Sequence, residues 1–357
     1  EGLRKVAWAR IVRILAFVGN WEEAERQCRK WLNEMPNDTA ALGALSEIFL
    51  LGFDDLDRSV EVFDKAMKHL EIELKSEGSN VERKLVPVVK KDASVIIKLA
   101  HQIGSKYFMN NDFTRSKDFF MLSYDLSVKP GIYSRDLEVL SSEFLAKNDF
   151  ATGNVVQAKK RLLDIGTENL TWGGHKLLGD MYKQGADSGD TEMYMNAIAS
   201  YREALKFSNN VISKADLHYL LGSSLLSYGE YKAAAENLRA SMAVQPNNSH
   251  VLNNLGVAYY HLNRKVEAQQ LIESSVKLDD GCMARFNLGA FLYDSRQYES
   301  AATHFRHALR LCRNAAKNGD EEAMEEADIQ VRLANSLRKD ARKLPEALAL
   351  YKEVLKS

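Results

Sequence analysis

The chain has 357 residues, enough for two or three ordinary domains unless an internal repeat makes one long array. Its 48 lysine and arginine residues nearly balance its 49 aspartate and glutamate residues, so no global positive field favours nucleic acid or an anionic membrane. Only 5 prolines occur, far below the usual ~5% of residues. Together with 20 glycines they leave few breaks for strands and hairpins, which favours helices.

The three cysteines, Cys28, Cys282 and Cys312, are widely separated and form no Cys-x-x-Cys pair of the kind found in zinc or redox sites. This usage indicates a reducing compartment, and we expect an intracellular, cytoplasmic location. No run of about 18 apolar residues occurs, so insertion into a membrane is not expected. The sequence begins with Glu1 instead of Met, so an earlier leader segment that has been removed is an open alternative.

A pair of neighbouring residues, the first apolar and the second small or compact, recurs along the chain. In the most regular part the pairs follow one another at intervals of 34 and 33 residues. In chain order they are Ile11-Val12, Leu45-Ser46, Ile103-Gly104, Leu140-Ser141, Leu178-Gly179, Leu221-Gly222, Leu255-Gly256, Leu288-Gly289 and Leu333-Ala334.

Each pair is followed, 12 residues later in the regular units, by a second small residue. These second residues are all Ala or Ser: Ala24, Ser59, Ser116, Ala158, Ala197, Ala234, Ala268, Ala301 and Ala347. Four residues further, on the same helical face, come Cys28, Phe63, Phe120, Leu162, Tyr201, Leu238, Ile272, Phe305 and Tyr351. The pattern predicts hairpins of two helices whose backbones approach closely at the small residues.

Several stretches depart from the regular spacing. Residues 74–96 are an insertion, which a loop or extended helices would absorb. The intervals indicate lengthened hairpin turns near residues 148–154 and 184–191. Residues 314–328 are rich in Glu and Ala, which favours elongated flanking helices there.

The pattern resembles the tetratricopeptide repeat, whose 34-residue unit carries a W-x2-L-G-x2-Y…A-x3-F…P motif. In the first unit the matching residues are Trp8, Ile11, Leu15, Ala24, Trp31 and Pro36, and in the seventh they are Leu255, Gly256, Tyr259 and Ala268. The resemblance implies an all-α fold, a right-handed α-α superhelix of antiparallel hairpins. It implies one solenoid over residues 1–357 whose first helices line a concave groove. The implied repeats are 5–38, 39–73, 97–130, 134–167, 172–210, 215–248, 249–281, 282–315 and 327–357.

The common catalytic motifs are missing from the sequence. It has no phosphate-binding loop, nucleophile elbow, H-E-x-x-H motif or dinucleotide fingerprint, so we expect neither an enzyme nor a cofactor. His304 and His307 have a metal-like spacing, and residues 187–192 group several carboxylates. An ordinary helix face and an ordinary polar turn explain these two patterns better, so no metal site is predicted. The basic clusters at residues 159–161 and 338–343 have the charge to meet phosphates or an acidic partner, but they are interpreted as solvated faces, and no nucleic-acid partner is expected.

The face of each first helix opposite the Leu-Gly contact is left to line the groove. In units six to nine this face carries aromatic and amide side chains, which suit a peptide's apolar side chains and its polar backbone. Asn254 and Asn287 hold equivalent positions, where superhelical relatives use asparagines to bind a peptide backbone; local hydrogen bonding is the alternative. We expect a partner segment to contact Tyr219, Asn253, Asn254, Tyr260, Phe286, Asn287, Tyr293, Arg332 and Asn335.

A carboxylate clamp like that of the family's cochaperones is not expected, because Tyr219, Met283 and Asn287 stand where its basic residues are needed. The sequence therefore predicts a non-catalytic scaffold or adaptor that binds protein partners, as peptide or helical segments, within a larger complex. The alternative is a regulatory or substrate-recruiting segment of a larger multidomain enzyme. The convex surface and the insertions stay open as other binding sites.

Overall fold

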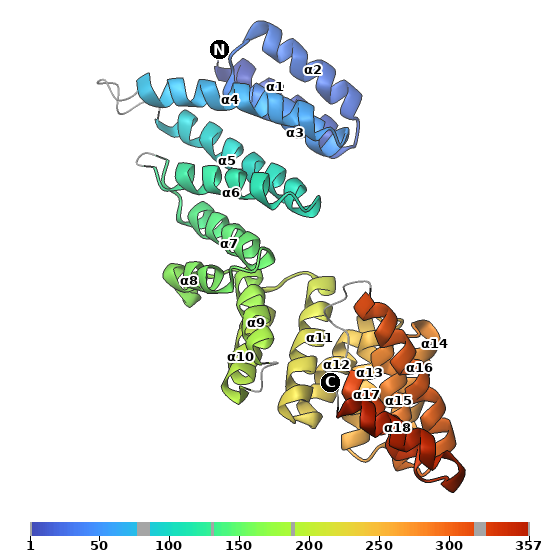
Figure 1. Ribbon diagram of the computed structural model, residues 1–357. Helices are drawn as coiled ribbons and strands as arrows, with labels where there is room; N and C mark the ends of the chain where they lie inside the picture. The colour runs from blue at the N-terminus through green and yellow to red at the C-terminus, as the bar shows by residue number, and fades with distance from the viewer. Residues whose placement is uncertain (1, 77–85, 130–131, 187–189, 318–325, 356–357) are drawn as a thin grey trace. The chain divides into compact units, whose positions relative to one another are not determined.

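The computed structural model describes residues 2–76, 86–129, 132–186, 190–317 and 326–355 (Figure 1). These residues form eighteen α-helices and no strand, which confirms the predicted all-α helical solenoid. None of the described helices is both long enough and apolar enough to cross a membrane. The chain divides into two compact units, Glu1–Leu177 and Leu178–Ser357, and each is described by itself.

The first unit contains eight complete helices and two short segments. A π-helical turn, Ile48–Gly52, follows the third helix, and a 3-10 turn, Thr167–Asn169, follows the eighth. The helices are α1 (Gly2–Phe17), α2 (Trp21–Glu34), α3 (Thr39–Glu47), α4 (Leu56–Ser76), α5 (Val86–Met109), α6 (Phe113–Ser127), α7 (Arg135–Ala151) and α8 (Val155–Ile165).

Helix α9 (Trp172–Ala186) begins in the first unit and ends in the second. A 3-10 turn, Ala341–Lys343, precedes the last helix. The helices of the second unit are α10 (Thr191–Phe207), α11 (Val211–Tyr228), α12 (Tyr231–Val244), α13 (Ser249–His261), α14 (Lys265–Leu278), α15 (Cys282–Asp294), α16 (Tyr298–Lys317), α17 (Glu326–Leu337) and α18 (Leu344–Val354).

Short turns join consecutive helices into antiparallel hairpins (Figure 1). In the α13–α14 turn, the Asn263 amide donates to the Tyr260 carbonyl at 3.0 Å and the Arg264 amide donates to the Tyr259 carbonyl at 2.8 Å. Such a reversal needs one residue with left-handed backbone angles, which glycine, asparagine and aspartate adopt most readily. The left-handed residues in the described hairpin turns are Gly19, Asp54, Asn111, Gly153, Gly229, Asn263 and Arg296.

The two helices of a hairpin leave no room for a side chain where the first helix carries one of five glycines. A methyl group added at Gly256 would lie 2.6 Å from the Ile272 side chain and 3.2 Å from the Ala268 carbonyl oxygen. Phe120, Tyr201, Leu238 and Phe305 lie 2.6–2.9 Å from the same position in their hairpins, beside Gly104, Gly179, Gly222 and Gly289. The predicted contacts at all five glycines are therefore confirmed, and each partner is the large residue predicted on the second helix.

A polar version of this contact joins α3 and α4. The Ser46 hydroxyl donates to the Ser59 carbonyl at 2.7 Å, and the Ser59 hydroxyl donates to the Ser46 carbonyl at 2.9 Å. Both serines are fully buried. The small residues of the second helices are buried in every hairpin, from Ala24 to Ala347. The first pair differs from the others: Ile11 is exposed and Val12 is buried.

The departures from regular spacing are mostly taken up by longer helices. The prediction of a lengthened turn at residues 148–154 was wrong, because α7 continues to Ala151 and leaves a turn of ordinary length. Helix α4 runs to Ser76, α5 starts at Val86, and α16 extends to Lys317, so parts of the insertion at 74–96 and of 314–328 are helical. Residues 77–85, 187–189 and 318–325 lie outside the described residues. The division into nine repeats within a single solenoid stays a prediction.

A buried histidine joins three helices of the first unit. The Nε2 atom of His101 on α5 lies 3.0 Å from the Ser123 hydroxyl on α6 and 3.2 Å from the Ser141 hydroxyl on α7. The ring also packs 5.0 Å from the ring of Phe144. Burial lowers the pKa of His101 to about 4, so the folded protein holds this side chain neutral at pH 7.

The free energy of unfolding of the first unit should therefore fall in mild acid. Between pH 6.5 and 4 the unfolded chain binds a proton at His101 that the folded chain does not, so stability decreases as pH falls. At pH 5 the loss from this group is about 2 kcal/mol relative to pH 7. Urea unfolding at both pH values should show the loss, and His101→Gln should reduce the difference between them; an equal difference in the variant would contradict the assignment.

Two glycine-to-alanine changes should shift stability in opposite directions. Gly256→Ala should destabilise by about 1–2 kcal/mol, because the added methyl meets Ile272 and the Ala268 carbonyl within van der Waals distance. Gly43→Ala in α3 should stabilise by about 0.5–1 kcal/mol, because a methyl there lies 3.4 Å from Val95 and alanine favours the helix. Chemical denaturation measures both, and a stabilising Gly256→Ala would refute the close helix approach.

Candidate partner-binding surface

The side chains expected to bind a partner lie on α11, α13, α15 and α17, the first helices of the last four hairpins. Once the face carrying Leu255 and Gly256 is buried against α14, the remaining face of α13 is left with amides and a tyrosine. The equivalent faces of the neighbouring first helices follow at intervals of one repeat. The structure brings six of the nine predicted residues into two contact groups and places the other three separately.

The first group is a chain of three asparagine amides on α13 and α15. Asn287 Nδ2 donates to Asn253 Oδ1 at 3.0 Å, and Asn253 Nδ2 donates to Asn254 Oδ1 at 3.2 Å. Asn253 is buried, whereas Asn254 and Asn287 are half-buried. Among the described residues, neither Asn254 Nδ2 nor Asn287 Oδ1 has a hydrogen-bond partner. The series of three linked amides thus has an unused donor, Asn254 Nδ2, at one end and an unused acceptor, Asn287 Oδ1, at the other.

The second group contains Tyr260, Phe286 and Arg332. The Arg332 guanidinium lies 5.5 Å from the centre of the Phe286 ring, which itself packs edge-on against Phe305 at 5.7 Å. The Tyr260 hydroxyl donates to the Asp294 carboxylate. This hydrogen bond, aided by burial and by the negative charge, raises the pKa of Tyr260 to about 12, while the positive charge of Arg332 opposes the shift. The group offers aromatic surface next to one cation and one anion.

The remaining predicted residues have separate surroundings. The side-chain Oδ1 of Asn335 accepts a hydrogen bond from the Tyr351 hydroxyl at 2.8 Å, so this amide is tied to α18. Tyr293 packs edge-on against Tyr298 with ring centres 5.3 Å apart. Tyr219 is half-buried and packs against the core of the second unit. Asp294 was missed by sequence reasoning, because the repeat interval between α13 and α15 is 33 residues and places Tyr293, not Asp294, at the position equivalent to Tyr260.

The residues with metal-like spacing have other partners. His304 Nδ1 lies 3.1 Å from the Arg285 guanidinium, and His307 Nε2 lies 3.4 Å from the Asp280 carboxylate. Burial, together with the charge of Arg285, lowers the pKa of His304. No three His, Cys, Asp or Glu side chains gather around a common point within the described residues. The acidic turn falls partly on residues 187–189, outside the described residues.

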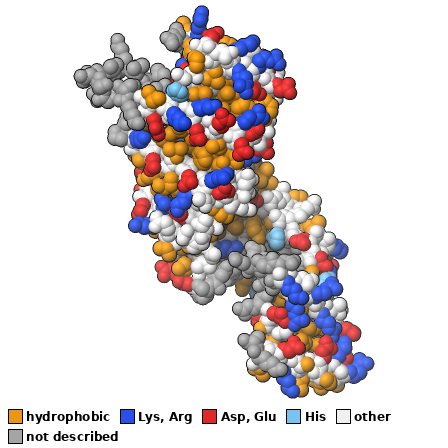
Figure 2. All heavy atoms as spheres, turned by 45° about the horizontal axis from the view of Figure 1, so that its top comes forward, with side chains coloured by type: hydrophobic (Ala, Val, Ile, Leu, Met, Phe, Trp, Pro, Cys, Tyr) orange, Lys and Arg blue, Asp and Glu red, His pale blue; other side chains and the backbone are white. Residues whose placement is uncertain are grey.

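Charges of both signs lie close together on one face of the molecule. Lysine and arginine side chains are interspersed with aspartate and glutamate on the face shown in Figure 2. In the basic cluster at residues 159–161, Arg161 donates to the buried carboxylate of Asp149 at 2.7 Å. This arginine therefore has a structural partner within its own hairpin.

The cysteines correct one expectation from the sequence. Cys282 at the start of α15 and Cys312 on α16 form a disulfide, with Cα atoms 5.6 Å apart. Sequence reasoning searched for cysteines close together along the chain, whereas the hairpin brings residues 30 positions apart into contact. The third cysteine, Cys28, is buried, and burial raises the pKa of its thiol to about 12. The argument for a reducing compartment loses its basis, because disulfides are rare in the cytosol.

Two family models match the second unit. One tetratricopeptide-repeat model covers residues 225–290 and another covers residues 284–319. These ranges contain helix α12 and the hairpins α13–α14 and α15–α16, with their close contacts at Gly256 and Gly289. The chain carries tetratricopeptide repeats. The repeat motif predicted from the sequence is confirmed.

Among curated proteins, this tetratricopeptide-repeat chain is similar to "Photosystem I assembly protein Ycf3" of Rippkaea orientalis. The two are 24% identical over 133 residues, which is 37% of this chain and 66%, just under two thirds, of that relative.

Solved structures of repeat proteins also match. MamA (41-end) of Desulfovibrio magneticus RS-1 has a TM-score of 0.42 at 21% identity, covering 49% of this chain and 96% of that one. The C-terminal part of a repeat-containing protein from Cytophaga hutchinsonii has a TM-score of 0.46 at 15% identity, covering 72% of this chain and 94% of that one.

The disulfide should stabilise the hairpin whose first helix carries Phe286 and Asn287. Closing a 30-residue loop stabilises by roughly 3 kcal/mol, so Cys282→Ser with Cys312→Ser should lower the free energy of unfolding by about that amount. Unreduced protein unfolded in denaturant should react with one equivalent of thiol reagent, and reduced protein with three. Three reactive thiols without reductant would contradict the pairing.

Proposed function

We propose that this protein is a non-catalytic scaffold that holds a segment of a protein partner along the first helices α11, α13, α15 and α17. The observation that carries the proposal is the amide chain Asn287–Asn253–Asn254, with an unused donor at one end and an unused acceptor at the other. A peptide backbone presents N–H and C=O groups in alternation and can use both ends at once.

Aromatic surface beside the amides supports the same proposal. Tyr260 and Phe286 lie on the same two helices as the amide chain, and both are half-buried. Their rings would cover the apolar side chains of a bound segment, while Arg332 and the Asp294 carboxylate would select its charged residues. Because Asn253 is buried, its part is to hold the two outer amides in place.

The comparisons support a role in protein interaction or assembly. The repeats are tetratricopeptide repeats, and the curated relative is by its name an assembly protein. We therefore place the chain in a multiprotein complex, with a peptide or helical segment of another subunit as its ligand and no cofactor. Partner capture with the complete chain, followed by mass spectrometry, would identify the subunit.

Two changes at the amide chain should weaken binding of the captured partner. Asn254→Ala with Asn287→Ala removes both unused groups, each worth about 1 kcal/mol, so the affinity should fall about 10- to 30-fold. Tyr260→Ala should cost about 2 kcal/mol or more if this ring is a main contact. Titration calorimetry with the purified partner measures each loss.

Controls separate loss of contact from loss of fold. Gln270→Ala, on the exposed face of α14, removes an amide from the opposite side of the same hairpin and should leave the affinity unchanged. Circular dichroism should show intact helices in every variant. Unchanged affinity in the folded double variant would move the binding site out of this surface.

A further inference from the structure

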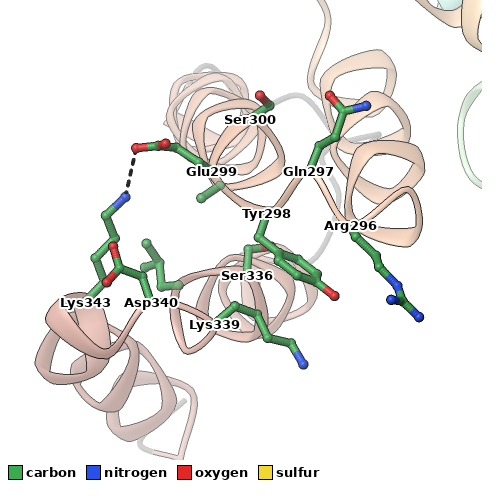
Figure 3. Close-up of a pocket in the computed structure, with 11 residues that line it drawn as sticks. Arg296, Gln297, Tyr298, Glu299, Ser300, Ser336, Lys339, Asp340 and Lys343 are labelled. Atoms are coloured by element: carbon green, nitrogen blue, oxygen red, sulfur yellow. Dashed lines mark hydrogen bonds and ion pairs between the residues drawn. The ribbon is translucent and has the colours of Figure 1, made fainter.

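A pocket lies at the turn end of the last two hairpins of the second unit. Its volume is about 400 Å³, and it lies between the α15–α16 turn and the turn that follows α17. Figure 3 shows its lining, with Arg296 from the first turn, Tyr298 from the start of α16, Ser336 from the end of α17 and Lys339 from the turn that follows α17. Apart from Tyr293, which packs against Tyr298, the residues predicted to bind a partner segment do not contact it.

The charges in the lining leave an excess of positive charge. Glu299 pairs with Lys343 at 3.3 Å, and Asp340 pairs with Arg342 at 3.1 Å. The Lys339 ammonium lies 5.4 Å from the centre of the Tyr298 ring. Within the described part of the chain, neither Lys339 nor Arg296 has a carboxylate partner, so two cations of the pocket stay without a counter-charge.

The backbone gives a second, independent observation about Arg296. It has a φ of 61° and occupies the left-handed position of its hairpin turn. The same position is Gly or Asn in the equivalent turns at Gly229 and Asn263, and Gly, Asn or Asp in the other described hairpin turns that have a left-handed residue, at Gly19, Asp54, Asn111 and Gly153. A residue with a long side chain is disfavoured in this conformation. The turn therefore holds an arginine in a backbone conformation that arginine disfavours, and this arginine lines the pocket.

We propose that the pocket binds an oxyanion, the carboxylate or phosphate group of a ligand, between Arg296 and Lys339. Figure 3 shows the guanidinium, the ammonium and the Tyr298 hydroxyl directed to the same side of the pocket. The planar guanidinium matches two oxygens of such a group, the ammonium supplies a point charge, and the hydroxyl supplies a further donor. The site does not depend on the proposed partner surface, because a small anion can bind here without a bound segment.

Calorimetric titration of the complete chain with inorganic phosphate and with acetate, at low ionic strength, tests the site. Arg296→Asn and Lys339→Gln should each weaken phosphate binding about 10-fold or more, since each removes a charged donor. Arg338→Gln, which removes the neighbouring exposed cation outside the pocket, should change it less than about twofold. Preference for phosphate over acetate would indicate a phosphorylated ligand, and equal binding would indicate a carboxylate.

The Arg296→Asn variant should also be more stable to heat, although it binds the anion more weakly. Asparagine suits the left-handed backbone better, so the variant should unfold at a temperature about 1–2 °C higher while it loses the anion. This gain shows that the loss of binding does not come from misfolding. Absence of phosphate binding in the unaltered chain, or equal loss in Arg338→Gln, would overturn the proposal.

Discussion

The close approach of two helix backbones within each hairpin is the constraint on which the structure depends. At Gly256 the Ile272 side chain and the Ala268 carbonyl fill the space that any β-carbon would need. Packing this dense contributes dispersion and hydrophobic stabilisation, but only while one partner is small. Where serine replaces glycine, as in the pair Ser46 and Ser59, two reciprocal hydrogen bonds satisfy the buried hydroxyls and hold the same spacing.

This constraint also fixes which residues of different hairpins meet. On the neighbouring first helices α13 and α15, the residues that meet are separated by one position more than the 33-residue repeat interval, as the contacts of Asn287 with Asn253 and of Tyr260 with Asp294 show. Each contact spans 34 residues of sequence. The side chains opposite the glycine contact therefore form ladders along the hairpins. A ladder of amides and aromatic rings is a surface on which an extended or helical segment can lie.

The contacts inside one hairpin could be predicted from the sequence, because they follow from a local period and a fixed step between small residues. Gly179 with Tyr201 and Gly289 with Phe305 were found in this way. Contacts that depend on the length of each helix were harder to predict from the sequence. The extra residues after Ser141 lengthen α7 instead of its turn, and no local signal distinguishes these outcomes. Both the Cys282–Cys312 disulfide and the bond from Tyr351 to Asn335 depend on cross-helix distances that residue types alone do not set.

Hydrogen–deuterium exchange of the complete chain, with and without its captured partner, tests the central claim most directly. Backbone amides exchange slowly where a bound segment restricts opening of the helix beneath it. The account predicts new protection in α13 and α15, the helices that carry Asn253, Asn254 and Asn287. Protection confined to α12, α14 and α16, with α13 and α15 unchanged, would contradict it.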